Sequence, residues 1–212
     1  MVERGAVRRV VGKAAPLDMD DVDTDQIIPA QFLKVLTRKG LGKYLFYRWR
    51  FDEQGRPKEG FVLDRPEFRD AVILVAGRNF GIGSSRENAV WALMDFGIRC
   101  VIASSFGDIF YANSVKNGLL CIRLEEEVLH NLRSRAASGS MVLDIDVERE
   151  SISLPEGGVL RFSLEPAVKQ WLIEGLDEIE YTLRMYGEAI RRYEEGMRRY
   201  LKPRRDAAVP LE

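Results

Sequence analysis

A short polar segment has the residue types needed for proton transfer and anion binding. Residues 77–87 read Gly-Arg-Asn-Phe-Gly-Ile-Gly-Ser-Ser-Arg-Glu and follow the apolar run 71–76. A helical pattern begins at their end, and the unpaired backbone N–H groups of a helix N-terminus attract negative charge. Such amides and a nearby arginine can stabilise Ser84 as an alkoxide, while Arg86 can hold a carboxylate through two parallel hydrogen bonds.

The same segment also has a purely structural interpretation. Ser84 and Glu87 have the spacing of a capping box, in which the serine accepts a hydrogen bond from the Glu87 backbone, and the glycines permit a tight turn. The two interpretations are compatible. The spacing does not favour a nucleotide site, because Arg86 stands where a dinucleotide fingerprint has its third glycine, and no Gly-Lys-Ser/Thr ending marks a P-loop.

An acidic, turn-rich segment over residues 18–25 is a second candidate. Its alternating aspartates, ending at Asp25, resemble calcium ligands, but Gln26 and Phe32 stand where an EF-hand loop has glycine and glutamate. A helix cap formed by Thr24 or Asp25 remains as the structural alternative.

The elements that position the polar segment are predicted by apolar runs. A buried strand over 71–76, a helix over 86–96 and a second buried strand over 98–103 form a βαβ unit, whose strands are parallel with a right-handed crossover. The pattern repeats with a helix over 107–116 and a strand over 119–124.

The remaining segments complete a mixed α/β domain. We expect a first strand over 6–12, a short helix or turn over 29–33, and a half-buried hairpin made of 141–147 and 151–154. Residues 34–69 mix aromatic residues with glycines and charges and show no dominant period. The expected domains are an α/β domain over 1–165, a helical extension over 166–205 that packs on it or on a partner, and a disordered tail over 206–212.

Composition excludes several classes of protein. The chain has 212 residues, 46% of them hydrophobic, and 32 basic against 33 acidic side chains, so it can bury a core but has no global field that attracts nucleic acid or an anionic membrane. It has neither an apolar run of the ~18 residues that a membrane span needs nor a signal-peptide pattern. We therefore expect a cytoplasmic protein without membrane association.

The chain is poor in metal ligands. Its two cysteines, Cys100 and Cys121, lie inside apolar runs and are expected to be buried thiols, and its one histidine, His130, lies in an amphipathic pattern as a surface or boundary residue. No zinc site or iron–sulfur cluster of its own is expected, and a histidine-dependent triad is a poor candidate.

Several motifs together resemble one known family. The pattern Gly-x-Asn-Phe-Gly-x-Gly-Ser-Ser-Arg-Glu-x-Ala over 77–89 is similar to the signature loop of the swivelling domain of the aconitase family. Residues 21–33, 105–120 and 171–179 resemble, in the same order and spacing, segments of the small subunits of isopropylmalate dehydratases. The resemblance covers about residues 8 to 195 and implies the aconitase swivelling-domain fold, a β/β/α arrangement with parallel βαβ units in a mixed sheet, plus a C-terminal helical segment.

Four positions depart from the family pattern. Arg78, Ile82, Asn88 and Gly107 stand where the family usually has Asp, Cys, His and Ala. Arg78 adds a cation beside the site, and Asn88 removes a titratable group.

The resemblance implies a hydro-lyase that works only as a heteromer. This chain would be the small subunit, and its large partner would hold a four-iron four-sulfur cluster that polarises the departing hydroxyl. The reaction that the resemblance implies is the interconversion of 2-isopropylmalate and 3-isopropylmalate in leucine biosynthesis. Ser84 would be the base.

The resemblance also assigns the remaining site residues. Ser85, Arg86, Thr24 and Asp25 would bind the hydroxy-dicarboxylate substrate, and the specificity loop would comprise Lys34, Val35, Leu36 and Thr37.

Two rival functions stay open on the sequence. A related hydro-lyase could act on homoaconitate, citraconate or dimethylmaleate, because apolar Val35 and Leu36 suit an isopropyl group whereas Lys34 or Arg38 suits a third carboxylate. A non-catalytic module that binds RNA or a partner is the other rival, because residues 184–205 carry eight basic side chains against three acidic ones. A C-terminal helix is the more typical interpretation of that segment. Its buried or partner-facing side would carry Tyr186, Ile190, Tyr193 and Met197.

Overall fold

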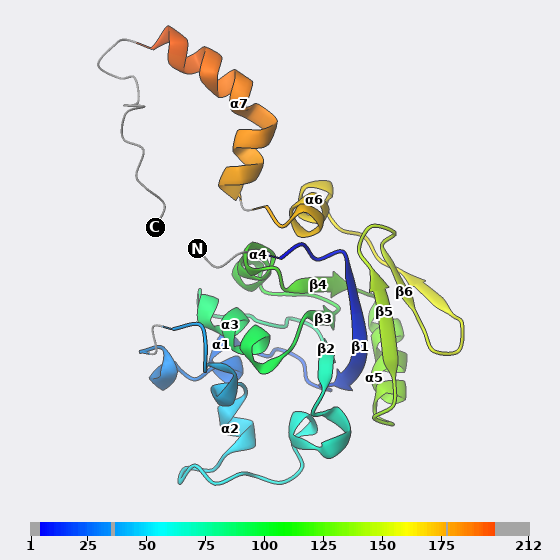
Figure 1. The fold of residues 1–212 in the computed structure, drawn as a ribbon. Coiled ribbons are helices and arrows are strands. Elements are labelled where there is room, and N and C mark those ends of the chain that lie inside the picture. The colour runs from blue at the N-terminus through cyan, green and yellow to red at the C-terminus, as the bar shows by residue number, and fades with distance from the viewer. Residues whose placement is uncertain (1–4, 35–36, 177, 198–212) are drawn as a thin grey trace. The chain divides into compact units, whose positions relative to one another are not determined.

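The computed structural model describes residues 5–34, 37–176 and 178–197. Contacts divide the chain into two compact units, one ending at Gly175 and one starting at Leu176. The first unit contains a seven-stranded mixed sheet with the order β4-β3-β2-β1-β5-β6-β7 (Figure 1). The mixed α/β class and the C-terminal helix predicted from the sequence are both confirmed.

The strands divide into a parallel and an antiparallel half, which meet at β1. The strands are β1 (Arg9–Pro16), β2 (Ala71–Val75), β3 (Cys100–Ala103), β4 (Leu120–Arg123), β5 (Val142–Asp146), β6 (Ser151–Ser153) and β7 (Val159–Arg161). Strands β1 to β4 are parallel, as the βαβ pattern predicts. On its other edge β1 pairs with β5 in antiparallel orientation, and β5, β6 and β7 continue as an antiparallel meander.

Helices of very different length connect the strands. The α-helices are α1 (Thr24–Ile27), α2 (Tyr47–Arg50), α3 (Glu87–Phe96), α4 (Asp108–Asn117), α5 (Glu126–Ala136), α6 (Pro166–Glu174) and α7 (Glu178–Gly196). Single turns of 3-10 helix occur at Ala30–Phe32, Gly42–Tyr44, Val62–Asp64 and Pro66–Phe68. No helix in the described ranges combines the length and apolar character needed to cross a membrane.

The two faces of the sheet contribute to two separate cores. Leu74 and Val101 face one core together with α1, α3 and residues 41–68, whereas Ile73 and Ile102 face the other together with α5 and α6. All four of these sheet side chains have 0% exposure. Burial on both faces explains why the parallel strands read as continuous apolar runs. Figure 1 accordingly shows α5 on the opposite side of the sheet from α1 and α3.

Several boundaries differ from the sequence-based expectations. The strand expected over 6–12 extends over Arg9–Pro16, because Ala14 and Ala15 pair with β2 and are fully buried. The short strand β7 was not predicted. The helix α1 is capped by Asp23, whose side chain accepts from the Gln26 backbone, and not by Thr24 or Asp25.

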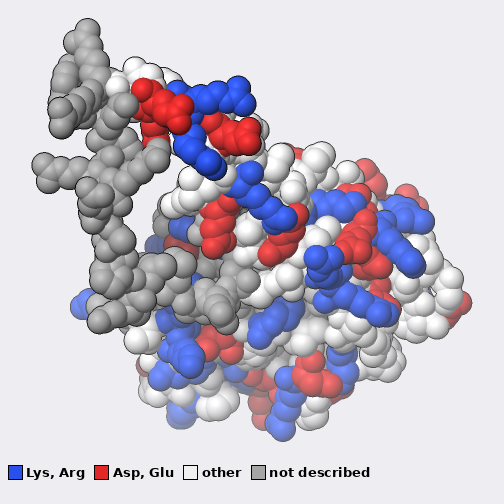
Figure 2. Space-filling model, turned by 45° about the horizontal axis from the view of Figure 1, so that its top comes forward, with Lys and Arg blue, Asp and Glu red and all other residues white. Residues whose placement is uncertain are grey.

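The two units divide after Gly175, whereas the expected boundary lay after residue 165. The helix α6 accounts for the difference: its Val168 and Leu172 are buried in the second core of the sheet domain. The second unit contains α7, and the tail expected over 206–212 lies outside the described residues. On the face drawn in Figure 2, acidic and basic side chains intermingle, as the balanced composition predicts.

Candidate active site at the carboxyl edge of the sheet

The signature loop, defined as residues 77–86, leaves the carboxyl end of β2 and leads into α3. In open α/β sheets, ligands bind in the crevice at this edge. Two glycines of the loop adopt a positive φ, 79° at Gly81 and 96° at Gly83, which side-chain-bearing residues rarely do. The loop is anchored in the core by Phe80, which is fully buried and packs edge-on against Phe110 at a ring distance of 5.4 Å.

The acidic segment, defined as residues 18–25, runs beside the signature loop. Four backbone hydrogen bonds join the two: Gly77 N to Met19 O at 3.0 Å, Asp21 N to Arg78 O at 2.9 Å, Gly81 N to Val22 O at 2.6 Å, and Thr24 N to Ile82 O at 2.9 Å. A Cβ at Gly77 would lie 2.0 Å from an Asp20 carboxylate oxygen, so this close approach requires glycine.

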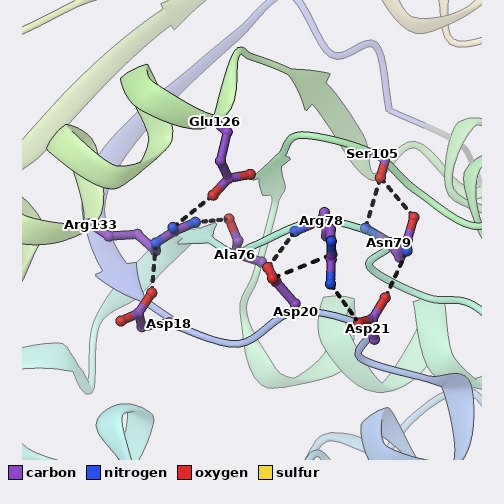
Figure 3. Close-up of polar contacts among 9 residues, drawn as sticks. All are labelled: Asp18, Asp20, Asp21, Ala76, Arg78, Asn79, Ser105, Glu126 and Arg133. Carbon is purple, nitrogen blue, oxygen red and sulfur yellow. Dashed lines mark hydrogen bonds and ion pairs between the residues drawn. The ribbon is translucent and has the colours of Figure 1, made fainter.

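Side chains secure the loop on both flanks (Figure 3). The Ser105 hydroxyl accepts from the Asn79 backbone at 2.8 Å and donates to the Asn79 side-chain oxygen at 2.9 Å. The Asn79 amide in turn donates to Asp21 at 2.7 Å. Asn79 has a φ of 54°, a conformation that asparagine tolerates better than most residues. Asn79 thereby ties the signature loop to the acidic segment on one side and to the residues after β3 on the other.

A buried arginine from α5 holds the point where β2 becomes the loop (Figure 3). Arg133 donates from Nη1 to the Ala76 carbonyl and from Nη2 to Glu126, each at 2.9 Å. Its Nε lies 2.9 Å from an Asp18 oxygen as an ion pair, without the geometry of a hydrogen bond. The hydrogen bond from Arg133 lowers the pKa of Glu126 below its usual value, with a further contribution from Ser104, against the opposing effect of burial.

Two of the positions that depart from the family pattern, Arg78 and Gly107, lie close to residues of the acidic segment or of the signature loop. Arg78 lies 3.4 Å from both Asp20 and Asp21, so two carboxylates accompany this added cation. At Gly107 a Cβ would lie 2.5 Å from the Gly81 carbonyl oxygen, so glycine allows the signature loop to approach closely there. Nothing in the structure explains the asparagine at position 88.

The predicted base, Ser84, and its neighbour Ser85 are exposed at the end of the loop. The predicted capping box is wrong: α3 begins at Glu87, has Arg86 as its N-cap and has no side-chain cap hydrogen bond. Glu87 instead accepts from Asn117 of α4 at 2.8 Å. The first amides of α3 are therefore left without a side-chain acceptor, which favours an anion at this position.

Thr24 and Asp25, the first two residues of α1, contact the signature loop directly. The Thr24 hydroxyl donates to the Ser84 carbonyl at 3.1 Å, and Thr24 is only 2% exposed. The Asp25 carboxylate accepts from Arg86 Nη1 at 2.6 Å and from the Ala30 amide at 2.9 Å. The hydrogen bond from Arg86 lowers the pKa of Asp25, assisted by Ala30 and the charge of Arg48, although burial acts in the opposite direction.

The expected specificity loop is described only at its ends. Lys34 and Thr37 are exposed, and Val35 and Leu36 lie outside the described residues. Beyond them the chain returns to α3: the Arg38 guanidinium lies 4.8 Å from the centre of the Trp91 ring, and the Asp95 carboxylate accepts from the Gly40 and Gly42 amides.

Both cysteines are buried free thiols. Cys100 is fully buried and Cys121 is 3% exposed, as predicted, and burial raises the pKa of Cys121 to about 12. His130 is exposed, also as predicted. Within the described ranges, no group of three or more His, Cys, Asp or Glu side chains could hold a metal ion.

Sequence reasoning missed two arginines of this edge. Arg133 belongs to a helix that the sequence places far from the loop, and Arg48 lies in the segment that has no clear period. No local pattern marks either residue, because each meets its partners only in the folded chain.

Comparison with known proteins identifies the family of this chain. The model of the aconitase C-terminal domain matches residues 5–127. The chain is 54% identical, over 84% of its length and 88% of the relative, to the 3-isopropylmalate dehydratase small subunit of Phenylobacterium zucineum. It is 55% identical, over 81% of its length and 86% of the relative, to the small subunit of the same name from Afipia carboxidovorans.

A solved structure has the same fold. The crystal structure of 3-isopropylmalate dehydratase, LeuD, from Methanocaldococcus jannaschii matches with a TM-score of 0.60 and 27% sequence identity. The match covers 89% of this chain and 99% of that chain.

Proposed function

The chain belongs to the aconitase C-terminal-domain family and, within it, to the small subunits of 3-isopropylmalate dehydratase; on that premise we propose that it is the small subunit of a heteromeric hydro-lyase. The reaction is the interconversion of 2-isopropylmalate and 3-isopropylmalate in leucine biosynthesis. The observation that carries the proposal is the match to these small subunits over most of both chains.

Ser84 is the residue that we assign to proton transfer. Dehydration removes a carbon-bound proton and a hydroxyl group, and an exposed serine at the N-terminal end of α3 can take the proton if its alkoxide is stabilised. The uncapped helix amides and the positive charge of Arg86 supply that stabilisation.

The other residues of the edge bind the substrate or hold the loop in place. Arg86 uses only Nη1 in its contacts with described residues, to Asp25 and to the Ile28 carbonyl, so Nε and Nη2 can still donate to a substrate carboxylate. Ser85, exposed beside Ser84, completes the substrate contact. The resemblance places Thr24 and Asp25 among the substrate contacts. We assign them instead to fixing Ser84 and Arg86, because Thr24 is buried and the Asp25 carboxylate is already shared between arginines.

Substrate choice belongs to the specificity loop. We assign it to Lys34, Val35, Leu36 and Thr37. A preference of the reconstituted pair for homoaconitate, citraconate or dimethylmaleate over isopropylmalate would overturn the choice of substrate while leaving the hydro-lyase class intact.

The group that polarises the departing hydroxyl belongs to the partner in this proposal. A Lewis acid lowers the barrier to loss of hydroxide, and we assign it to a four-iron four-sulfur cluster of the large subunit. The proposal includes a cytoplasmic location, where free thiols such as Cys100 and Cys121 stay reduced.

Reconstitution tests the proposal directly. The purified chain should bind an iron–sulfur large subunit and interconvert the isopropylmalates only in its presence. Activity of a chain shown by elemental analysis to be free of iron and of any partner would overturn the two-subunit assignment. Salt-sensitive RNA binding by the isolated chain, without hydro-lyase activity of the pair, would instead favour the non-catalytic alternative.

A further inference from the structure

Arg48 lies next to the proposed substrate contacts, although no sequence pattern singles it out. Its Nη1 is 2.7 Å from Asp25 Oδ2, while Arg86 Nη1 is 2.6 Å from Asp25 Oδ1. One carboxylate is therefore flanked by two guanidinium groups, one on each oxygen. The three side chains together carry one net positive charge, so their surroundings attract an anion.

The backbone around Arg48 is firmly held. Phe46, fully buried, has a φ of 50° and donates its amide to the Ile27 carbonyl of α1 at 2.8 Å. The Arg48 carbonyl accepts from Lys58 Nζ at 2.8 Å. Two residues later, Arg50 forms hydrogen bonds to Asp64 from two nitrogens. The start of the Arg48 side chain is thus fixed beside α1, and only its outer part is free to turn.

Arg48 keeps most of its binding capacity. Its side chain is 62% exposed, and its only ion pair among the described residues uses one nitrogen. An arginine has five N–H donors in a planar fork that matches a carboxylate. A single exposed ion pair contributes only about 0–1 kcal/mol to stability, so stability gives little reason for an arginine here.

We propose that Arg48 binds one carboxylate of the dicarboxylate substrate while Arg86 binds the other. This inference rests on the proposed function, which supplies a substrate with two carboxylates. It makes Arg48 a residue that selects diacids over monoacids, because the second carboxylate gains a charge-assisted partner only at this position.

Steady-state kinetics of the reconstituted pair provide the first test. Arg48→Ala should raise KM for isopropylmalate about tenfold or more, as expected for loss of a hydrogen bond to a charged group, and change kcat less than about twofold. Arg48→Lys should recover part of the loss. The matched control is Arg56→Ala, which removes another exposed arginine paired with an aspartate of the same region and should leave KM unchanged. A fall in kcat at unchanged KM would mean that Arg48 affects only the chemical step and not substrate binding, and would overturn the inference.

Equilibrium binding to the same pair separates this inference from the proposed function. The probes are isopropylsuccinate and its two monocarboxylate analogues, in each of which a methyl group replaces one carboxylate. Arg48→Ala should weaken the diacid and one monoacid about tenfold and leave the other monoacid unaffected. Arg48-dependent diacid binding without isopropylmalate turnover would refute the proposed substrate but support the inference. Equal diacid affinity in wild type and variant, or no diacid binding by wild type, would overturn it.

Discussion

Strand β2 and the signature loop are continuous in sequence, but different interactions hold them. Ile73, Leu74 and Val75 of the strand are fully buried, and apolar packing on both faces of the sheet fixes them. The loop carries the exposed Ser84, and backbone hydrogen bonds to the acidic segment and to residues 105–107 fix its path. Changes in the strand should therefore affect stability, and changes in the loop should affect chemistry.

The sharpest test of this contrast is Ser84→Ala. If Ser84 is the base, turnover by the reconstituted pair should fall by about a hundredfold to ten-thousandfold. The hydroxyl makes no hydrogen bond with any described residue, so the free energy of unfolding and the affinity for the large subunit should stay nearly unchanged. Turnover, denaturant unfolding and partner titration measure the three quantities. A variant with normal turnover would remove Ser84 from the proton-transfer role.

Leu74→Ala should show the opposite behaviour. Truncating a fully buried leucine in the core beneath α3 should lower the free energy of unfolding by about 2–5 kcal/mol. At a temperature where the variant remains folded, kcat should stay within about twofold of wild type, because the loop keeps its hydrogen bonds. Urea unfolding and initial rates check the two halves of this expectation. A stable variant with impaired kcat would contradict the separation of strand and loop.

Two glycines of the loop allow a matched comparison. A Cβ at Gly81 would lie 2.2 Å from the Phe110 ring, whereas at Gly83 the nearest atom is 3.6 Å away, and both residues have positive φ. Gly81→Ala should therefore cost about 3 kcal/mol from overlap and backbone strain together, and Gly83→Ala about 1 kcal/mol from strain alone. Only the first should displace the loop and reduce kcat. Equal losses in the two variants would show that packing against Phe110 does not set the loop position.

The smallest effect concerns the pH dependence of stability. The hydrogen bond from Arg86 lowers the pKa of Asp25 in the folded chain, so ionised Asp25 contributes stability above its unfolded pKa of about 3.9. That contribution is lost as the pH falls through the lower, folded pKa. Compared with Asp25→Asn, the wild type should be more stable at neutral pH, and the difference should shrink below about pH 4. Unfolding curves for both proteins across pH 3 to 7 measure this difference, and a constant difference would contradict it.

The sequence predicts the sheet better than the site because the two depend on contacts of different range. The runs that form β2, β3 and β4 are apolar over their whole length and identify themselves locally. The ion pair of Asp25 with Arg86 joins residues 61 positions apart, and no periodicity reports it. The capping box was wrongly predicted because Glu87 has a competing partner, Asn117, on α4.

The missed elements have similar explanations. The strand β7 has only three residues, and none of them is buried, so its pattern is too weak to recognise. Residues 34–69 depend on aromatic contacts and on hydrogen bonds such as those of Arg50 with Asp64, which have no fixed spacing. Arg48 and Arg133 were missed for the same reason.

The position of β1 has a consequence for how the protein is made. This strand leaves the ribosome before the other six strands of the sheet, yet it lies in the centre of the sheet between β2 and β5. Lys13 of β1 pairs with Ala71 of β2 on one edge and with Val142 of β5 on the other. Neither edge can be paired until the corresponding strand has been synthesised. During synthesis β1 therefore has two unpaired edges, a state prone to aggregation. Closing the sheet over such sequence separations makes folding slow, and loss of β1 would divide the sheet into two unconnected halves.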